Sequence, residues 1–187
     1  GVGGHCLPKD TWLLLYGNKR YGLNHEQYEP SVLSDSRYLN DFMPIHMVEL
    51  LEKGLKEIGK KIQGSEICIL GYAFLENSDD SRNTPTKKAI EGLLKRGATH
   101  RLHDPYIKED DGVKISNDLE YCIKGSDGVL LMTKHDQYLK LTPEWLSSLM
   151  RNKVIVDGRN ALEGEEFIEK GFTFLGIGKG NYRGVKR

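Results

Sequence analysis

The second half of the chain alternates between short apolar runs and amphipathic stretches. Nearly continuous apolar runs are typical of strands that are buried on both faces of a parallel sheet. We expect strands at 66–72, 100–103, 128–132, 154–156 and 172–175, and helices at 85–96, 119–124, 143–150 and 165–170. This alternation predicts an α/β fold with a Rossmann-like, mostly parallel open sheet flanked by helices.

A longer amphipathic stretch precedes the sheet region and predicts a long helix over residues 31–59. Its apolar residues recur at steps of three and four: Leu39, Phe42, Met43, Met47, Leu50, Leu51, Leu55 and Ile58. Pro44 lies inside this stretch and must either kink the helix or begin a second one. The stripe by itself fits a plain packing helix. Its apolar surface exceeds what one face of the sheet can cover, so we expect an assembly element and a homodimer.

The first thirty residues show little periodicity. They contain a glycine-rich start, an apolar patch at 12–16, and a stretch at 21–30 that we interpret as an irregular or short helical connection. The linker to the sheet region is short, at about residues 60–65.

Composition narrows the classes of function. The 27 Lys and Arg residues balance the 27 Asp and Glu residues, which argues against a nucleic-acid or anionic-membrane partner. No apolar run approaches the roughly 18 residues that a membrane span needs. The first six residues lack the features of a signal peptide, and the three distant cysteines imply no disulfide framework, so we expect a cytoplasmic protein. No C-x-x-C or H-x-x-x-H spacing is present, so we expect no metal site.

The N-terminal segment offers the clearest candidate chemistry. Cys6 is followed by Lys9 and Asp10, which suits covalent catalysis by a thiol with a carboxylate that handles water. A flexible terminus with a buried cysteine fits the same residues equally well.

Two loops at expected strand ends carry an arginine. Arg82 lies just before a predicted helix that Thr84 would cap with Pro85 at its first position, an arrangement that suits a phosphate. Arg159 follows the fourth strand, where ligands of open parallel sheets bind. Each has a plain alternative, a solvated loop or a tight turn. No G-x-G-x-x-G is present, and we interpret the glycines at 176–180 as a loop rather than a dinucleotide motif.

Taken together in order, these motifs resemble the UDP-glucose/GDP-mannose dehydrogenase family. The stretch 3–10 (GGHCLPKD) resembles its catalytic cysteine motif, 40–44 (NDFMP) its central-helix motif, and 69–85 the opening of its C-terminal domain. Asp104-Pro105 and the stretch 157–159 (DGR) match later landmarks, so the resemblance spans nearly the whole chain.

The resemblance implies a C-terminal part of such an enzyme. Residues 1–62 would hold the end of the catalytic loop and a remnant of the helical dimerisation domain, and residues 63–187 the UDP-sugar-binding domain. The N-terminal NAD domain, and with it the family's catalytic lysine, asparagine and glutamate, would be missing. We therefore expect the chain alone to be inactive.

The implied reaction is an NAD-dependent oxidation of a UDP-sugar at its primary alcohol, in polysaccharide biosynthesis. Two hydride transfers proceed through a thiohemiacetal and a thioester on a cysteine, and water releases the uronic acid. The implied catalytic residues are Cys6 and Asp10, the NAD contacts are Cys6, Leu7, Pro8, Lys9 and Arg82, and the sugar-nucleotide contacts are Gly1, Val2, Gly3, Phe74, Leu75 and Arg159.

Two departures from the family pattern bear on the substrate. The family usually has a lysine where this chain has Leu75, which removes a cation from the expected sugar or phosphate contact. The cysteine motif mixes branches: its Gly-His-Cys resembles the UDP-N-acetylmannosamine branch, and Pro8-Lys9-Asp10 resembles the UDP-glucose and GDP-mannose branches. The stretch 80–83 (DSRN) and Met43-Pro44 favour the N-acetylhexosamine branch.

Two other functions remain open at this point. One is an inactive or split module that binds nucleotide or only assembles with a partner, which Leu75 and the missing NAD domain motivate. The other is an independent cysteine hydrolase that uses Cys6 with His5, although adjacent residues rarely point at each other usefully.

Overall fold

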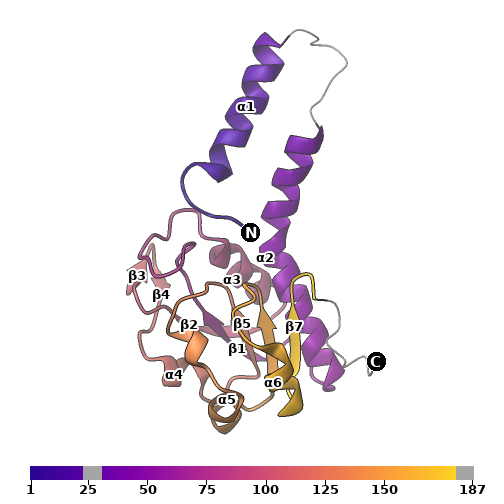
Figure 1. Cartoon of the computed structure of the whole chain (residues 1–187), viewed down its shortest axis with the longest axis vertical. Helices are drawn as coiled ribbons and strands as arrows, with labels where there is room; N and C mark the ends of the chain where they lie inside the picture. Colours follow the sequence, from indigo (N-terminus) through magenta and orange to yellow (C-terminus); the bar gives the residue numbers. More distant parts are fainter. Residues whose placement is uncertain (23–30, 180–187) are drawn as a thin grey trace.

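The structure, a computed structural model, describes residues 1–22 and 31–179. Its centre is a five-stranded sheet with the order β2-β1-β5-β6-β7, in which all neighbouring strands are parallel (Figure 1). The strands are β1 (Glu66–Leu70), β2 (Thr99–His103), β5 (Gly128–Leu131), β6 (Val154–Asp157) and β7 (Thr173–Gly176). The predicted Rossmann-like parallel sheet is therefore confirmed.

Helices connect successive strands and cover both faces of the sheet. They are α3 (Pro85–Lys95), α4 (Leu119–Ile123), α5 (Pro143–Leu149) and α6 (Gly164–Glu169), each close to its predicted position. Alternate strand residues face opposite layers, as the strand period of two requires. Ile67 and Ile69 of β1 pack with α3 and the long helix α2 (Ser31–Glu57), whereas Cys68 and Leu70 pack with α4, α5 and α6.

The long helix α2 (Ser31–Glu57) runs without interruption through Pro44, so no second helix begins there. Its C-terminal half belongs to the core, because Met47, Val48, Leu51 and Leu55 are all buried against the sheet. Its N-terminal half extends away from the sheet (Figure 1).

A helix that the sequence analysis missed precedes α2. Residues 7–21 form α1 (Leu7–Tyr21), a helix that the low periodicity of this stretch did not predict. None of its residues is buried, and Trp12 meets Tyr38 of α2 edge-on with 5.6 Å between ring centroids. A helix with no buried face leaves no periodic signature, which explains the miss. The connection predicted at 21–30 lies outside the described residues from residue 23 onwards.

Three small elements were also not predicted. A two-stranded antiparallel hairpin pairs β3 (Glu109–Asp110) with β4 (Val113–Lys114), and a 3-10 turn, η1 (Tyr138–Lys140), follows β5. Across the described residues, no helix is long and apolar enough to cross a membrane.

Candidate functional site

The strand order reverses between β1 and β5, which makes their carboxyl ends the point where open α/β sheets bind ligands. Arg159, at the end of β6, reaches across this edge. Its Nε donates to the carbonyl of Met132 at 2.9 Å, and its Nη2 donates to the carbonyl of Phe74 at 3.0 Å. One half-buried guanidinium thus joins the loops that follow β1, β5 and β6.

The glycine-rich N-terminal segment lies directly on the loop after β1. The Gly4 N–H donates to the carbonyl of Arg82 at 2.8 Å, and the Asn83 amide donates to the carbonyl of Gly4 at 2.9 Å. A side chain at Gly3 would place its Cβ 2.6 Å from Cβ of Phe74, and Gly4 has a φ of +89°. Only glycine allows this close approach, so the segment that carries Cys6 is fitted to the Phe74 loop.

A buried carboxylate is hydrogen-bonded to the backbone of the loop after β1. Asp104, at the end of β2, accepts hydrogen bonds from the N–H groups of Tyr72 (2.7 Å) and Ala73 (2.9 Å) and from Nε2 of His135 (3.2 Å). Burial by itself would raise the Asp104 pKa. The hydrogen bonds from His135 and from the backbone N–H groups of Ala73, Tyr72 and Tyr106 instead lower that pKa to about 2. Asp104 is therefore a fixed anion.

His135 extends this network to the far end of the loop. Its Nδ1 accepts a hydrogen bond from the Asn77 N–H at 2.9 Å, so the proton on Nε2 faces Asp104. The loop that carries Phe74 and Leu75 is thereby anchored from β2 and β5 at once. The N–H groups after β1, which hold a phosphate in dinucleotide folds, are already occupied by the Asp104 carboxylate.

Cys6 stands at the exposed end of this site. It is the N-cap residue of α1, and its carbonyl accepts the Asp10 N–H at 2.8 Å, so Asp10 lies one helical turn away. The side chain of Asp10 lies 3.7 Å from Lys9. In the part of the chain that the structure describes, no hydrogen bond joins an imidazole to the Cys6 thiol.

Arg82 also projects into solvent near Cys6. Its guanidinium is bonded to the Asp80 carboxylate, with Nη2 2.6 Å from Oδ2. This hydrogen bond and the charge of Asp80 raise the pKa of Arg82, and Cys6 adds a smaller contribution in the same direction. The hydrogen bond to Arg82 likewise lowers the pKa of Asp80.

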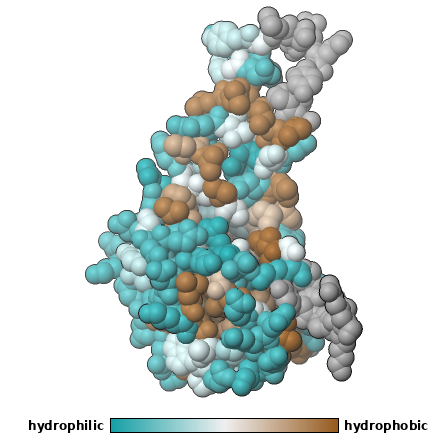
Figure 2. Space-filling model, in the orientation of Figure 1, coloured by the Kyte–Doolittle hydropathy of each residue, from teal (hydrophilic) through white to brown (hydrophobic). Residues whose placement is uncertain are grey.

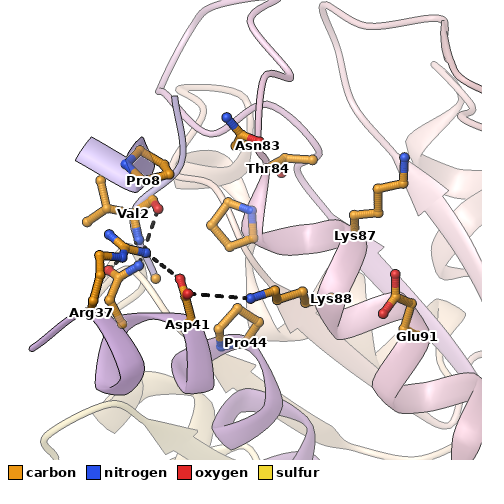
Figure 3. Close-up of a pocket in the computed structure, with 13 residues that line it drawn as sticks. Val2, Pro8, Arg37, Asp41, Pro44, Asn83, Thr84, Lys87, Lys88 and Glu91 are labelled. Carbon is orange, nitrogen blue, oxygen red and sulfur yellow. Dashed lines mark hydrogen bonds and ion pairs between the residues drawn. The ribbon is translucent and has the colours of Figure 1, made fainter. Parts of the chain in front are cut away.

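A cavity of about 320 Å³ lies on the other side of the N-terminal segment, between that segment, α2 and the start of α3 (Figure 3). Arg37 and Asp41 of α2 point toward each other along its wall and are hydrogen-bonded. Lys88 of α3 lies 3.8 Å from Asp41 and completes the bridge between the two helices. The charges that line this wall are therefore largely paired.

Comparison with known proteins identifies the family of the chain. The UDP binding domain of the UDP-glucose/GDP-mannose dehydrogenase family matches residues 68–164, more than half of the chain. The chain belongs to the UDP-glucose/GDP-mannose dehydrogenase family. The resemblance carried by the sequence motifs is thus confirmed.

Individual members of this dehydrogenase family match over almost the whole chain. UDP-N-acetyl-D-mannosamine dehydrogenase from Pyrococcus horikoshii is 34% identical over 182 residues, which are 97% of this chain and 40% of that protein. UDP-glucose 6-dehydrogenase from Bacillus subtilis is 28% identical over 192 residues, 100% of this chain and 40% of that protein.

The solved structures give the same picture. The crystal structure of NDP-N-acetyl-D-galactosaminuronic acid dehydrogenase from Methanosarcina mazei Go1 has a TM-score of 0.90 at 42% identity, and the match covers 95% of this chain and 38% of that one. The chain therefore spans about 40% of the length of the dehydrogenases it matches.

The structure brings some of the expected site residues together and leaves others apart. Gly3, Phe74 and Arg159 form one connected group, and Val2 continues it through its backbone. Leu75 lies on the same loop but is 49% exposed. The expected NAD contacts are Cys6, Leu7, Pro8, Lys9 and Arg82, and all of them are exposed or partly exposed. The turn after β1, whose N–H groups are bonded to Asp104, does not fit a dinucleotide phosphate.

Sequence reasoning missed the residues whose hydrogen bonds hold the site loops and the cysteine segment in place. Asp104 was given no role beyond that of a family landmark and His135 was not named, although both lie in loops at the expected ligand edge of the sheet. The available signal was their position, since Asp104 directly follows β2 and His135 lies four residues after β5, and the carboxyl ends of these parallel strands lie at one edge of the sheet. The α2 residues Arg37 and Asn40 gave no such signal, because their contacts lie more than 25 positions away in the chain.

Proposed function

We propose that this chain carries the nucleophilic thiol and the nucleotide-sugar domain of an NAD-dependent nucleotide-sugar 6-dehydrogenase. The substrate class we infer is a UDP-N-acetylhexosamine, with UDP-N-acetylmannosamine as the first candidate. One observation carries the proposal: the segment that bears Cys6 is fitted, through Gly3 and Gly4, onto the loop that Arg159 ties to the switch point of the sheet. The N-acetylhexosamine names of the Pyrococcus and Methanosarcina relatives support the branch.

The placement of Cys6 suits the covalent stage of this reaction. The thiolate adds to the aldehyde carbon of the sugar while the aldehyde oxygen takes a proton, which gives a thiohemiacetal. The exposed residues Cys6, Leu7, Pro8, Lys9 and Arg82 would hold NAD, which would supply the hydride acceptor for the oxidations. Once the bound carbon is a thioester, water attacks it, Asp10 accepts the water proton, and the thiolate leaves as the uronic acid is released.

The sugar-nucleotide contacts follow from the same geometry. Gly1, Val2 and Gly3 would line the sugar end next to Phe74, and Arg159 would hold the nucleotide side, where a cation suits a diphosphate. Leu75 would contribute an apolar surface where the family usually has a cation. A UDP-glucose or GDP-mannose substrate is the alternative within the same reaction.

The assembly that we propose is a homodimer formed through the 31–59 helix, in the cytoplasm. Residues 1–62 would supply the catalytic loop and the assembly helix, and residues 63–187 the nucleotide-sugar domain. The remaining part of the NAD site would come from sequence of the kind that the longer relatives have.

A second candidate is a non-catalytic module that binds nucleotide or only assembles with a partner. The exposed position of Leu75 favours it, because this side chain adds no charge to a site meant for a phosphate. Uronic-acid formation by this chain with NAD would exclude that alternative.

Protection of Cys6 by substrate tests the proposal. Iodoacetamide should alkylate the exposed Cys6, and saturating UDP-N-acetylmannosamine should slow this alkylation several-fold, because the sugar end would cover the thiol. UDP alone, which lacks the sugar, should protect less and serves as the control. Equal alkylation rates with and without the nucleotide sugar would contradict the proposed site.

A further inference from the structure

The backbone of the cysteine segment is held from its second side by the long helix α2. The Val2 N–H donates to Oδ1 of Asn40 at 2.8 Å, and the Asn40 amide donates back to the Val2 carbonyl at 3.4 Å. One turn earlier on α2, Nη1 of Arg37 donates to the carbonyl of Leu7 at 3.3 Å. The Asn40 and Arg37 side chains are therefore hydrogen-bonded to the backbone of the segment on both sides of Cys6.

Pro44 explains why the segment docks at this turn of α2. Proline has no N–H, so the carbonyl of Asn40, one turn earlier, has no partner inside the helix. The chain passes this carbonyl so closely that a Cβ at Gly1 would lie 2.9 Å from the Asn40 oxygen. The missing hydrogen bond thus leaves a polar carbonyl at this turn of α2. Beside it, the Asn40 side chain bonds to both the N–H and the carbonyl of Val2.

Arg37 is itself fixed in place. It is 6% exposed, and its guanidinium is paired with Asp41 in the next turn of α2, which Lys88 of α3 also approaches. The C-terminal half of α2 is packed into the core through Leu51 and Leu55. The hydrogen bonds from Arg37 and Asn40 therefore join the cysteine segment to a helix whose position is fixed.

We propose that Asn40 and Arg37 are positioning residues that hold Cys6 at the edge of the site, beside Arg82. The loop side of this arrangement is the pair of hydrogen bonds that join Gly4 to Arg82 and Asn83. The segment is held between α2 and the loop after β1, and losing the α2 side should let Cys6 drift from the arginine. This inference deepens the proposed function, but it concerns the ligand-free chain and needs neither substrate nor NAD.

The test measures the rate of Cys6 alkylation by iodoacetamide at pH 7 without ligand. The thiolate is the reactive form of a cysteine, and a cation close to the sulfur favours this form in general. Asn40→Ala should lower the rate about twofold to fivefold, the range expected for the loss of one exposed charge contact. Arg82→Ala should lower it by a similar factor, and the double variant should show no further loss, because both changes remove the same interaction.

Matched variants separate positioning from general destabilisation. Asn18→Ala makes the same change at an exposed site on α1 and should leave the rate unchanged. Asn40→Asp keeps the acceptor for the Val2 N–H and should lose less than Asn40→Ala. The buried Cys68 and Cys122 report on the fold and should stay unlabelled in every variant.

Several outcomes would overturn the proposal. An Asn40→Ala rate equal to that of Asn18→Ala would do so, as would losses from Asn40→Ala and Arg82→Ala that add in full. If Cys68 and Cys122 become labelled in Asn40→Ala, Asn40→Ser decides, because its shorter polar side chain cannot reach the Val2 N–H, and a Cys6 rate equal to the parent's in that variant rejects the role. None of these results depends on whether the chain binds a nucleotide sugar, so the proposed function stands or falls separately.

Discussion

At the residue scale, the site is organised by a few side chains that each join distant segments. Arg159 joins three loops, and Asp104 with His135 anchors the Phe74 loop from beneath. The sequence could place Arg159, because a residue just after a buried parallel strand must lie at the ligand edge. It could not pair Asp104 with His135, since their contact depends on the spatial order of strands that are not adjacent in sequence.

The Asp104 carboxylate makes stability depend on acid. Its pKa of about 2 in the folded chain lies below the ordinary aspartate value, so its contribution is complete above pH 4 and is lost as pH falls toward 2. Asp104→Asn should therefore lower the free energy of unfolding by about 2 kcal/mol at pH 7. Urea unfolding at pH 7, 5, 4 and 3 should show this difference shrinking below pH 4. A difference that stays constant with pH would contradict this role of the charge.

At the scale of helices and strands, the elements that pack into the core could be predicted from the sequence, whereas an element without buried residues could not. Most of the strands were predictable because burial on both faces makes them short, nearly continuous apolar runs, as in β1, β5 and β6. The helices α3 to α6 were predictable because each repeats its apolar residues along one face. The helix α1 was not, since its apolar residues at 12–16 are consecutive and none of its side chains is buried. Signals of its ends were present all the same, in Pro8 at the start and in Lys19 and Arg20 in the last turn.

The upper half of α2 carries an apolar face that nothing in the described structure covers. Val32, Leu39 and Phe42 recur at steps of seven and three, so they share one side of the helix, and they are 76%, 62% and 43% exposed. Figure 2 shows apolar surface gathered over these projecting helices, whereas the sheet domain is mostly polar. This distribution supports an assembly role for the helix.

The assembly prediction can be checked by sedimentation. The chain should sediment as a dimer, and Phe42→Asp should raise the dissociation constant at least about tenfold, because a charge would be buried in an apolar contact. Leu139→Asp, at an exposed apolar residue beside the sheet, is the matched control and should leave the dimer intact. A parent chain that stays monomeric at high concentration would contradict the prediction.

At the scale of the whole molecule, the N-terminal segment contacts the sheet domain at the carboxyl ends of its strands. The sheet domain supplies the loops of the switch point, and the N-terminal segment reaches them only because α2 runs from the core to the segment (Figure 1). The family motifs in the sequence indicated which stretches belong together. They could not show that α2 grips the cysteine segment, because hydrogen bonds between side chain and backbone leave no sequence periodicity.

A calorimetric titration of this chain with UDP, with GDP as the control, tests most directly whether a nucleotide-sugar site lies at the switch point of the sheet. We predict that UDP binds more tightly than GDP and that Arg159→Ala weakens UDP binding at least about tenfold, as expected when a cation that pairs with a phosphate is lost. Binding of neither nucleotide, or UDP binding that Arg159→Ala leaves unchanged, would contradict a nucleotide-sugar site at the switch point of this sheet.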